Sequence, residues 1–263
     1  MLKEPKDKLK ASEARDVDEA LAALEVIEKR RAPVLLARLR RRLDLPPGAD
    51  VLEIGAAQGT YLTALTRLGM RPRGVEPWAP AIEVSKELAR RTGVETDIKL
   101  GRGEELPFKS ESFDLVLAIS VMEHVEDPDA VFREAHRVLR PGGGFYFYTG
   151  SALHPRQVEI AGFPLFPWYP DRVRRRIMRW AVEKRPDLIG HTEQPAWNWF
   201  TPWGTRRALR RAGFSEAVER WDLVDPDELT GRKRIGTIAV QRVPGMRLVG
   251  AFASGAIAFL AIK

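Results

Sequence analysis

Two acidic residues and a glycine-rich turn are the parts of this 263-residue sequence that could do chemistry. Glu53 ends a short apolar run, and Gly55 and Gly59 follow it in the pattern Glu-x-Gly-x-x-x-Gly. Glycines in such a turn let the backbone approach a ligand, and the N-terminus of the following helix offers free N–H groups. Glu76 ends a second predicted strand 21 residues after Gly55. An acid in that place can accept hydrogen bonds from ribose hydroxyls, so the pair predicts a nucleoside site.

The glycine spacing argues against a dinucleotide. The dinucleotide fingerprint is Gly-x-Gly-x-x-Gly, and Ala57 stands where its second glycine would let the pyrophosphate approach. A nicotinamide-dependent dehydrogenase is therefore disfavoured. The turn suits an uncharged or carboxylate-bearing nucleoside better.

The four histidines are the candidate general bases. His124 follows the predicted strand 113–120 and is the best placed, although it could equally shape its loop by a hydrogen bond to the backbone. His136 falls within a predicted helix and is interpreted as a surface or packing residue. His154 and His191 reach a site only if the aromatic stretch that contains them folds over it.

The elements that must position these groups alternate between strand and helix. The predicted strands are 51–54, 73–76, 98–100, 113–120 and 145–148, and the helices between them are 61–68, 79–91 and 129–139. Such alternation with short connections is typical of βαβ units. We predict an α/β, Rossmann-like, doubly wound and mostly parallel seven-stranded sheet with helices on both faces.

Helical and irregular segments flank this core. A helix over 12–43 is expected to be capped by Asp16 or Asp18 and split at Pro33. Pro141 and the glycines 142–144 follow the predicted helix 129–139 and precede the predicted strand 145–148. Beyond residue 150 we expect helices over 173–184 and 202–212, a strand over 217–221 and an excursion over 225–255. The apolar stretch 245–262 is interpreted as a helix followed by a last buried strand, 256–262, rather than a membrane span.

Charge and aromatic residues are unevenly distributed. The chain has 43 Lys and Arg against 36 Asp and Glu, a formal charge of +7. Residues 51–150 carry −3, whereas 151–221 carry +6 and six of the seven tryptophans. The chain has no cysteine, which excludes a thiolate metal site and a cysteine nucleophile. The charged segment 1–10 shows no secretory signal, and a cytoplasmic location is expected, with membrane association as the alternative.

Six successive motifs make the sequence resemble class I S-adenosylmethionine-dependent methyltransferases of the small-molecule type, which includes ubiquinone and sugar methyltransferases. The motifs are Val51-Leu-Glu-Ile-Gly-Ala-Ala-Gln-Gly59, Gly74-Val-Glu-Pro77, Gly103-Glu-Glu-Leu-Pro-Phe108, Phe113-Asp-Leu-Val-Leu117, Met122-Glu-His-Val125 and Leu139-Arg-Pro-Gly-Gly143. Ala57-Gln58 departs from the Cys/Ser/Thr-Gly usual in the family.

The resemblance implies a role for each matched position. Glu53 and the turn with Gly55, Ala56 and Gly59 would hold the methionine end of S-adenosylmethionine, and Glu76 the ribose. Pro77 and Trp78 would flank the adenine, although Trp78 could instead be a packed core residue. Gly103, Glu104 and Glu105 would lie at the adenine amino group. Ser120 would face the methionine and the acceptor, with Glu123 and His124 at the mouth. No metal is expected.

The resemblance also implies four regions. These are an N-terminal helical region (1–50), a cofactor-binding core (51–150), a basic aromatic region that we call the lid region (151–215), and C-terminal strands (216–263). The segment 151–204 would set the acceptor specificity. The expected acceptor pocket draws on His154, Trp168, Tyr169, His191, Trp197 and Trp199, or the aromatic residues of this segment only pack a small lid on the sheet.

The acceptor itself stays open at this point. Four arginines fall on one face of a helix by their spacing: Arg172, Arg175, Arg176 and Arg179. This face is either solvated, attractive to an acidic substrate, or in contact with an anionic membrane. A nucleic-acid methyltransferase is disfavoured, because Ser120-Val-Met-Glu stands where amino-directed base methylation needs Asn/Asp-Pro-Pro-aromatic. RNA methylation and a catalytically silent cofactor-binding protein are the alternatives, and the oligomeric state is left open.

Overall fold

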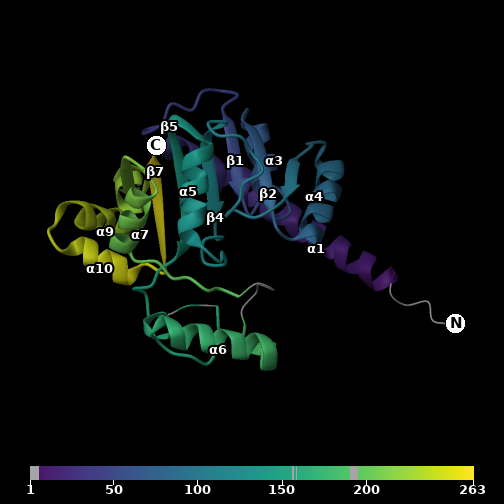
Figure 1. The fold of residues 1–263 in the computed structure, drawn as a ribbon. Helices are drawn as coiled ribbons and strands as arrows, with labels where there is room; N and C mark the ends of the chain where they lie inside the picture. Colours follow the sequence, from purple (N-terminus) through teal and green to yellow (C-terminus); the bar gives the residue numbers. More distant parts are fainter. Residues whose placement is uncertain (1–5, 156, 158, 190–194) are drawn as a thin grey trace. The chain divides into compact units, whose positions relative to one another are not determined.

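A computed structural model describes residues 6–155, 157, 159–189 and 195–263 (Figure 1). Seven strands form one sheet in the order β3-β2-β1-β4-β5-β7-β6. β1 pairs in parallel with β2, and β2 with β3, whereas β6 and β7 are antiparallel. The strands are β1 (Asp50–Ile54), β2 (Arg71–Glu76), β3 (Asp97–Leu100), β4 (Phe113–Ile119), β5 (Leu139–Gly150), β6 (Glu216–Glu219) and β7 (Ala256–Ile262). The predicted mostly parallel, seven-stranded α/β fold is confirmed.

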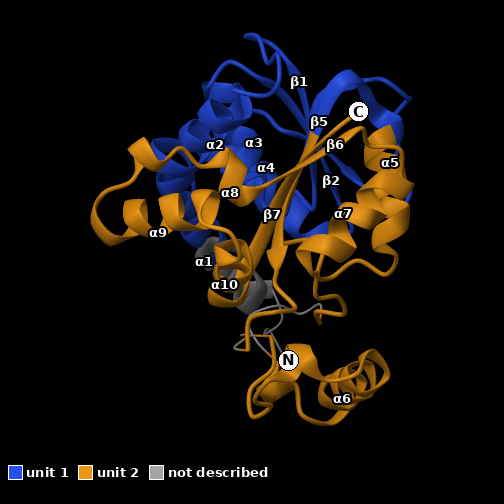
Figure 2. Ribbon diagram, turned by 90° about the vertical axis from the view of Figure 1, so that its left-hand side faces the viewer, with its two compact units in different colours: residues 1–117, 137–144 blue, residues 118–136, 145–263 orange. Residues whose placement is uncertain are grey.

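The helices accompany these strands in the predicted alternation. They are α1 (Lys6–Val26), α2 (Ala32–Leu39), α3 (Thr60–Arg67), α4 (Ala79–Thr92), α5 (Pro128–Val138), α6 (Asp171–Lys184), α7 (Pro202–Arg211), α8 (Arg220–Leu223), α9 (Gly231–Arg242) and α10 (Met246–Ala253). The chain divides into two compact units, unit 1 (residues 1–117 and 137–144) and unit 2 (118–136 and 145–263), which Figure 2 colours separately.

The start of unit 1 differs from the sequence prediction. Neither Asp16 nor Asp18 caps a helix, because α1 already begins at Lys6. Asp18 instead receives a hydrogen bond from Arg91 on α4 at 2.7 Å. Pro33 lies in the first turn of α2, where a proline is tolerated, and the π-helical turn Ile27–Arg31 precedes it.

The beginning of β5 gives the Leu139-Arg-Pro-Gly-Gly143 motif a structural role. The guanidinium of Arg140 donates to Asp114 Oδ1 at 2.7 Å and to Asp50 Oδ2 at 2.9 Å. The Asp50 amide donates to Asp114 Oδ2 at 2.8 Å. These bonds join the first residues of β1 and β4 to β5. The predicted strand 145–148 is therefore longer than expected, since residues 139–144 also belong to β5, with Gly142 at a φ of +77°.

Aromatic residues form the core of unit 2. Phe145 and Phe147 on β5 stack at 5.2 Å between ring centroids, and Phe147 stacks on Phe259 of β7 at 5.9 Å. His136 packs edge-on against Phe214 at 5.2 Å, in agreement with its interpretation as a packing residue. The strand predicted to reach Trp221 ends at Glu219, and Trp221 lies in α8.

The apolar stretch 245–262 forms α10 and then the buried strand β7, as predicted. Across the described residues, no helix combines the length and apolarity needed to cross a membrane.

Gly74 on β2 is a position where a side chain has no room. A Cβ there would lie 2.6 Å from Ala56 Cβ and 3.0 Å from Leu62 Cδ1. Gly74→Ala should therefore lower the free energy of unfolding by about 1–3 kcal/mol, the usual result of overpacking. Gly236→Ala is the control, because a Cβ there meets nothing within 4 Å and α9 should gain about 1 kcal/mol. Urea denaturation of both variants tests this, and equal stabilities would contradict it.

Candidate functional site

The turn between β1 and α3 in unit 1 has a left-handed backbone at three positions. Gly55, Ala57 and Gly59 have φ values of +71°, +45° and +74°. Gly59 lies at the N-cap of α3. The amides of Gly55 and Ala56 donate to Val75 O at 2.8 and 3.1 Å, which holds the turn against β2. Ala57 carries a Cβ in a region that favours glycine, at a cost of about 1–2 kcal/mol, so another contact must hold it there.

Glu76, the last residue of β2, supplies that contact. Its Oε2 accepts from the Ala57 amide at 2.9 Å and its Oε1 from the Trp78 amide at 3.0 Å. The side chain is buried, with 7% of its residue surface exposed. One carboxylate therefore joins the turn after β1 to the turn after β2. A carboxylate has about four acceptor positions, so both oxygens retain capacity for ribose hydroxyls.

Glu53 on β1 is the second buried acid of unit 1. Its Oε2 has no hydrogen-bond partner among the described residues. Burial, together with the nearby charge of Glu76, raises the pKa of Glu53 well above its ordinary value. A buried acceptor without a donor suits a ligand that brings a cationic or N–H group.

The predicted adenine-binding residues lie on two loops of unit 1. Trp78 is 41% exposed, so its interpretation as a packed core residue is wrong. Pro77 before it is also exposed. On the loop after β3, Gly103 is buried, Glu104 half-buried and Glu105 exposed. The Gly101 amide donates to Glu76 O at 3.1 Å, which attaches this loop to the end of β2.

Unit 2 contains the residues predicted to act on the acceptor. Ser120 follows β4, is exposed, and has a φ of +56°; its amide donates to Tyr148 O at 2.8 Å. Glu123 is buried and accepts from the Thr149 hydroxyl at 2.6 Å. Burial raises the pKa of Glu123 although this hydrogen bond opposes the effect. His124 is half-buried, and its Nδ1 is buried without a hydrogen-bond partner among the described residues.

Asn198 is a functional candidate that sequence reasoning missed. Its Nδ2 donates to Val125 O at 2.7 Å and to Met122 O at 3.3 Å. The amides of Trp197 and Asn198 both donate to Glu123 O, at 2.7 and 3.0 Å. The lid region thus fixes the loop that carries Glu123 and His124. A lone asparagine between two tryptophans gave no signal for these contacts in the sequence.

Three aromatic residues of the expected acceptor pocket pack against a buried cluster in the lid region. Tyr169, Trp197 and Trp199 lie against a buried cluster formed by Ile160, Phe166, Met178 and Ala181. The structure thus places these three in a small core of the lid region. Trp168 is half exposed, and its Nε1 donates to Leu153 O at 3.1 Å. His154 is half-buried, and His191 lies outside the described residues.

The arginines of α6 divide between packing and exposure. The Arg174 guanidinium lies 4.8 Å from the Trp199 ring centroid, and burial lowers the Arg174 pKa. Arg175 pairs with Asp171 at 2.9 Å. Arg172, Arg176 and Arg179 are exposed. The predicted four-arginine face therefore presents three arginines to solvent. In the described part of the chain, no group of three or more His, Cys, Asp or Glu could hold a metal ion.

Comparison with known proteins shows a family to which part of the chain is similar. Residues 52–147 match a family model described as a methyltransferase domain. The match confirms the resemblance drawn from the motifs, and it covers the turn after β1, Glu53 and Glu76.

Known proteins similar in sequence to this chain match it over segments of about the same length. A ubiquinone biosynthesis O-methyltransferase of Xanthomonas axonopodis pv. citri (strain 306) is 31% identical over 118 residues, which are 44% of this chain and 49% of that protein. A second such enzyme, from Methylobacterium sp. (strain 4-46), is 37% identical over 102 residues, 39% of this chain and 41% of that protein. The chain thus matches half or less of the length of these relatives.

Solved structures share the fold. Phosphoethanolamine N-methyltransferase 2 of Haemonchus contortus, in complex with S-adenosyl-L-methionine, superposes with a TM-score of 0.55 at 16% identity, over 87% of this chain and 51% of that chain.

The buried acid Glu53 should make the stability of the protein depend on pH. The folded state keeps the Glu53 proton to a higher pH than the unfolded chain does, so the free energy of unfolding falls as pH rises above about 4.3, the ordinary value for Glu. Glu53→Gln removes this loss and should stabilise the protein at pH 8 by about 1–3 kcal/mol.

Urea denaturation of wild type and Glu53→Gln between pH 5 and 8 measures this difference. The control is Glu83→Gln, which removes an exposed acid paired with Lys86 and should follow wild type. A constant difference between wild type and Glu53→Gln over this range would show that Glu53 is not protonated in the folded state.

Proposed function

We propose that the chain is an S-adenosylmethionine-dependent methyltransferase that transfers a methyl group to a small-molecule or lipid-like acceptor. The observation that carries the proposal is the Glu76 carboxylate at the end of β2, which holds the turn after β1 open at backbone positions suited to a nucleoside. The match of residues 52–147 to the methyltransferase family model supports it. When bound, the cofactor supplies an electrophilic methyl group on a sulfonium.

The residues of unit 1 are proposed to bind this cofactor. The free lone pairs of Glu76 accept from the ribose hydroxyls, and the exposed indole of Trp78 stacks on the adenine, with Pro77 beside it. Glu53 and the 55–59 turn take the methionine end, whose ammonium satisfies the unpaired Oε2 of Glu53. Gly103, Glu104 and Glu105 hold the adenine amino group. This donor set fits the group chemically, since a buried unpaired carboxylate and a cation compensate each other.

The residues of unit 2 are proposed to serve the acceptor. Methyl transfer is an in-line displacement, and near-attack positioning can supply about 7–11 kcal/mol of the barrier. Ser120 and Glu123 position the acceptor. His124 removes its proton where the acceptor is protonated, which contributes about 10²–10⁴-fold. Asn198 and Thr149 hold the loop and the Glu123 carboxylate in place.

The lid region is proposed to select the acceptor. Trp168 is exposed, and His154 and the packed residues Tyr169, Trp197 and Trp199 lie on the same segment. His191 belongs to this proposed set as well. The exposed arginines Arg172, Arg176 and Arg179 would favour an acidic acceptor or an anionic membrane surface.

The fold alone does not establish this chemistry. The [4+2]-cyclase SpnF superposes with a TM-score of 0.53 at 19% identity, over 89% of this chain and 81% of that chain. A shared sheet thus accommodates different reactions, and the activity has to be tested at the residues.

Glu76→Ala tests the ribose contact. The variant should bind S-adenosylhomocysteine at least about tenfold more weakly in calorimetry, because it removes a charged hydrogen-bond acceptor. Glu76 also shapes the turn, so the experiment adds a 2′,3′-dideoxyribose analogue. Wild type should prefer the natural ribose, and Glu76→Ala should bind both compounds equally. A preference of the same size in the variant would remove the ribose assignment and leave Glu76 a structural role.

His124→Ala tests the proposed base. Incubation with methyl-labelled cofactor and a cell extract, followed by mass spectrometry, identifies a labelled product for the assay. The variant should lower turnover of that acceptor by about 10²-fold or more while cofactor affinity stays unchanged. His136→Ala is the control, since His136 packs on Phe214. Unchanged turnover in His124→Ala would assign His124 to loop structure.

A further inference from the structure

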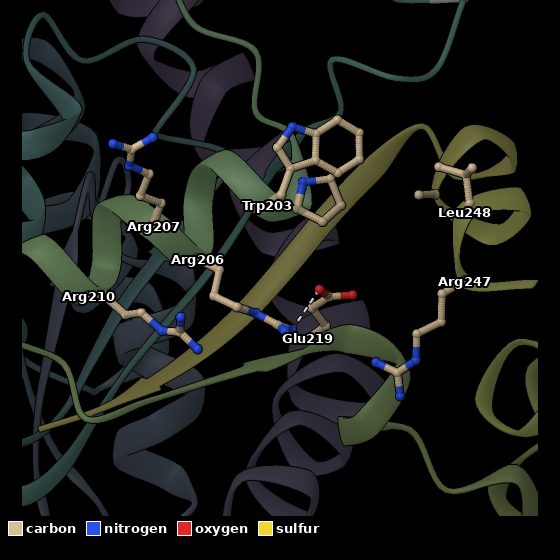
Figure 3. Close-up of a pocket in the computed structure, with 9 residues that line it drawn as sticks. Trp203, Arg206, Arg207, Arg210, Glu219, Arg247 and Leu248 are labelled. Carbon is tan, nitrogen blue, oxygen red and sulfur yellow. Dashed lines mark hydrogen bonds and ion pairs between the residues drawn. The ribbon is translucent and has the colours of Figure 1, made fainter. Parts of the chain in front are cut away.

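Unit 2 contains a pocket that the proposed methyl transfer does not use. It lies between α7, the end of β6 and α10, and encloses about 560 Å³ (Figure 3). The residues that line it are Pro202, Trp203, Arg206, Arg207, Arg210, Glu219, Arg247, Leu248 and Ala251. None of them belongs to the proposed cofactor or acceptor residues.

The lining of this pocket carries an excess of positive charge. The lining includes four guanidinium groups and one carboxylate, that of Glu219. Arg206 donates to Glu219 at 2.8 Å, and Arg247 donates to Asp222 at 2.9 Å. Arg210 is exposed and has no ion-pair or hydrogen-bond partner for its side chain within the described residues. Figure 3 shows Arg206 directed toward Glu219, with Arg210 on one side and Arg247 on the other.

The helix dipole of α7 accounts for only some of the arginines that line the pocket. Arg210 and Arg211 lie in the last turn of α7, where a cation is favoured by the helix dipole. Arg206 and Arg207 lie outside that turn. The Nε of Arg206 is buried without a hydrogen-bond partner among the described residues. An unpaired buried donor is costly, and an anionic oxygen in the pocket would pair with it.

An apolar wall adjoins the guanidinium groups. The indole of Trp203 is 58% exposed and Leu248 is 53% exposed, whereas Ala251 is buried beneath them. Trp203 and Arg206 lie one turn apart on α7, so the flat ring and the charge occupy neighbouring parts of one helix face. A ligand that fills both parts needs an anionic group joined to an aromatic or apolar body.

We propose that this pocket binds the phosphate group of an organic phosphate whose aromatic or apolar body lies on Trp203 and Leu248. Guanidinium groups form bidentate hydrogen bonds with phosphate oxygens, and a dianion balances the excess charge of the lining. The phosphate can come from a soluble metabolite or from a lipid headgroup, which share this chemistry. The proposal does not rest on methyl transfer.

The soluble form is tested by calorimetric titration of the protein with 1-naphthyl phosphate. Arg210→Gln should weaken binding at least about tenfold, because it removes a charged donor, and Arg232→Gln, an exposed arginine of α9 outside the pocket, should bind as wild type does. Trp203→Leu should weaken 1-naphthyl phosphate but leave the binding of inorganic phosphate unchanged. Both Arg210 and Trp203 are exposed, so these variants should keep the wild-type unfolding midpoint.

The lipid source is tested by cosedimentation with phosphatidylcholine vesicles that contain phosphatidic acid, compared with pure phosphatidylcholine. Binding to the acidic vesicles alone, lost in Arg210→Gln and kept in Arg232→Gln, would support the pocket and assign the phosphate to a lipid. The proposal is overturned if neither 1-naphthyl phosphate nor these vesicles bind, or if Arg210→Gln and Arg232→Gln weaken binding equally.

Discussion

The Glu76 carboxylate is the contact on which the turn after β1 in unit 1 depends. It accepts backbone hydrogen bonds from Ala57 and Trp78, which belong to different loops. Hydrogen bonds to a charged acceptor are worth about 1.5–3 kcal/mol each, enough to offset the left-handed conformation of Ala57. The close approach of the turn to β2 in turn requires a glycine at position 74. Folding of the turn and the proposed recognition of a ribose therefore use the same side chain.

Polar contacts lie at both ends of the strands in unit 1, and they differ in character. At the beginning of β1 and β4, Asp50 and Asp114 are satisfied by Arg140 and by a backbone amide. At the other end of β1, Glu53 is buried with an unpaired oxygen beside Glu76. The side chains of Asp50, Asp114 and Arg140 thus satisfy one another's hydrogen bonds. Glu53 keeps an unsatisfied acceptor, which is unfavourable for stability and useful for a cationic ligand.

Tryptophans and arginines of unit 2 lie in two different environments. Trp197 and Trp199 pack in the small core of the lid region, where the guanidinium of Arg174 lies over the indole of Trp199. On α7 the same residue types stay exposed around a pocket. The two settings differ in their neighbours: α6 lies against Phe166 and Trp199, whereas the α7 residues of the pocket adjoin α10 and the end of β6.

The sequence by itself determined the sheet, its alternating helices and the acids at the strand ends. Strands β1 to β4 are short and strongly patterned, and Glu53 and Glu76 are placed by position along them. Only the tertiary structure decided what depends on contacts between distant residues. In the structure the first helix begins at Lys6, Asp18 pairs with Arg91, and the glycines at 142–144 belong to β5. It also brought Asn198 to the loop of Glu123, 75 positions earlier, because side-chain partners so far apart leave no periodic signal in the sequence.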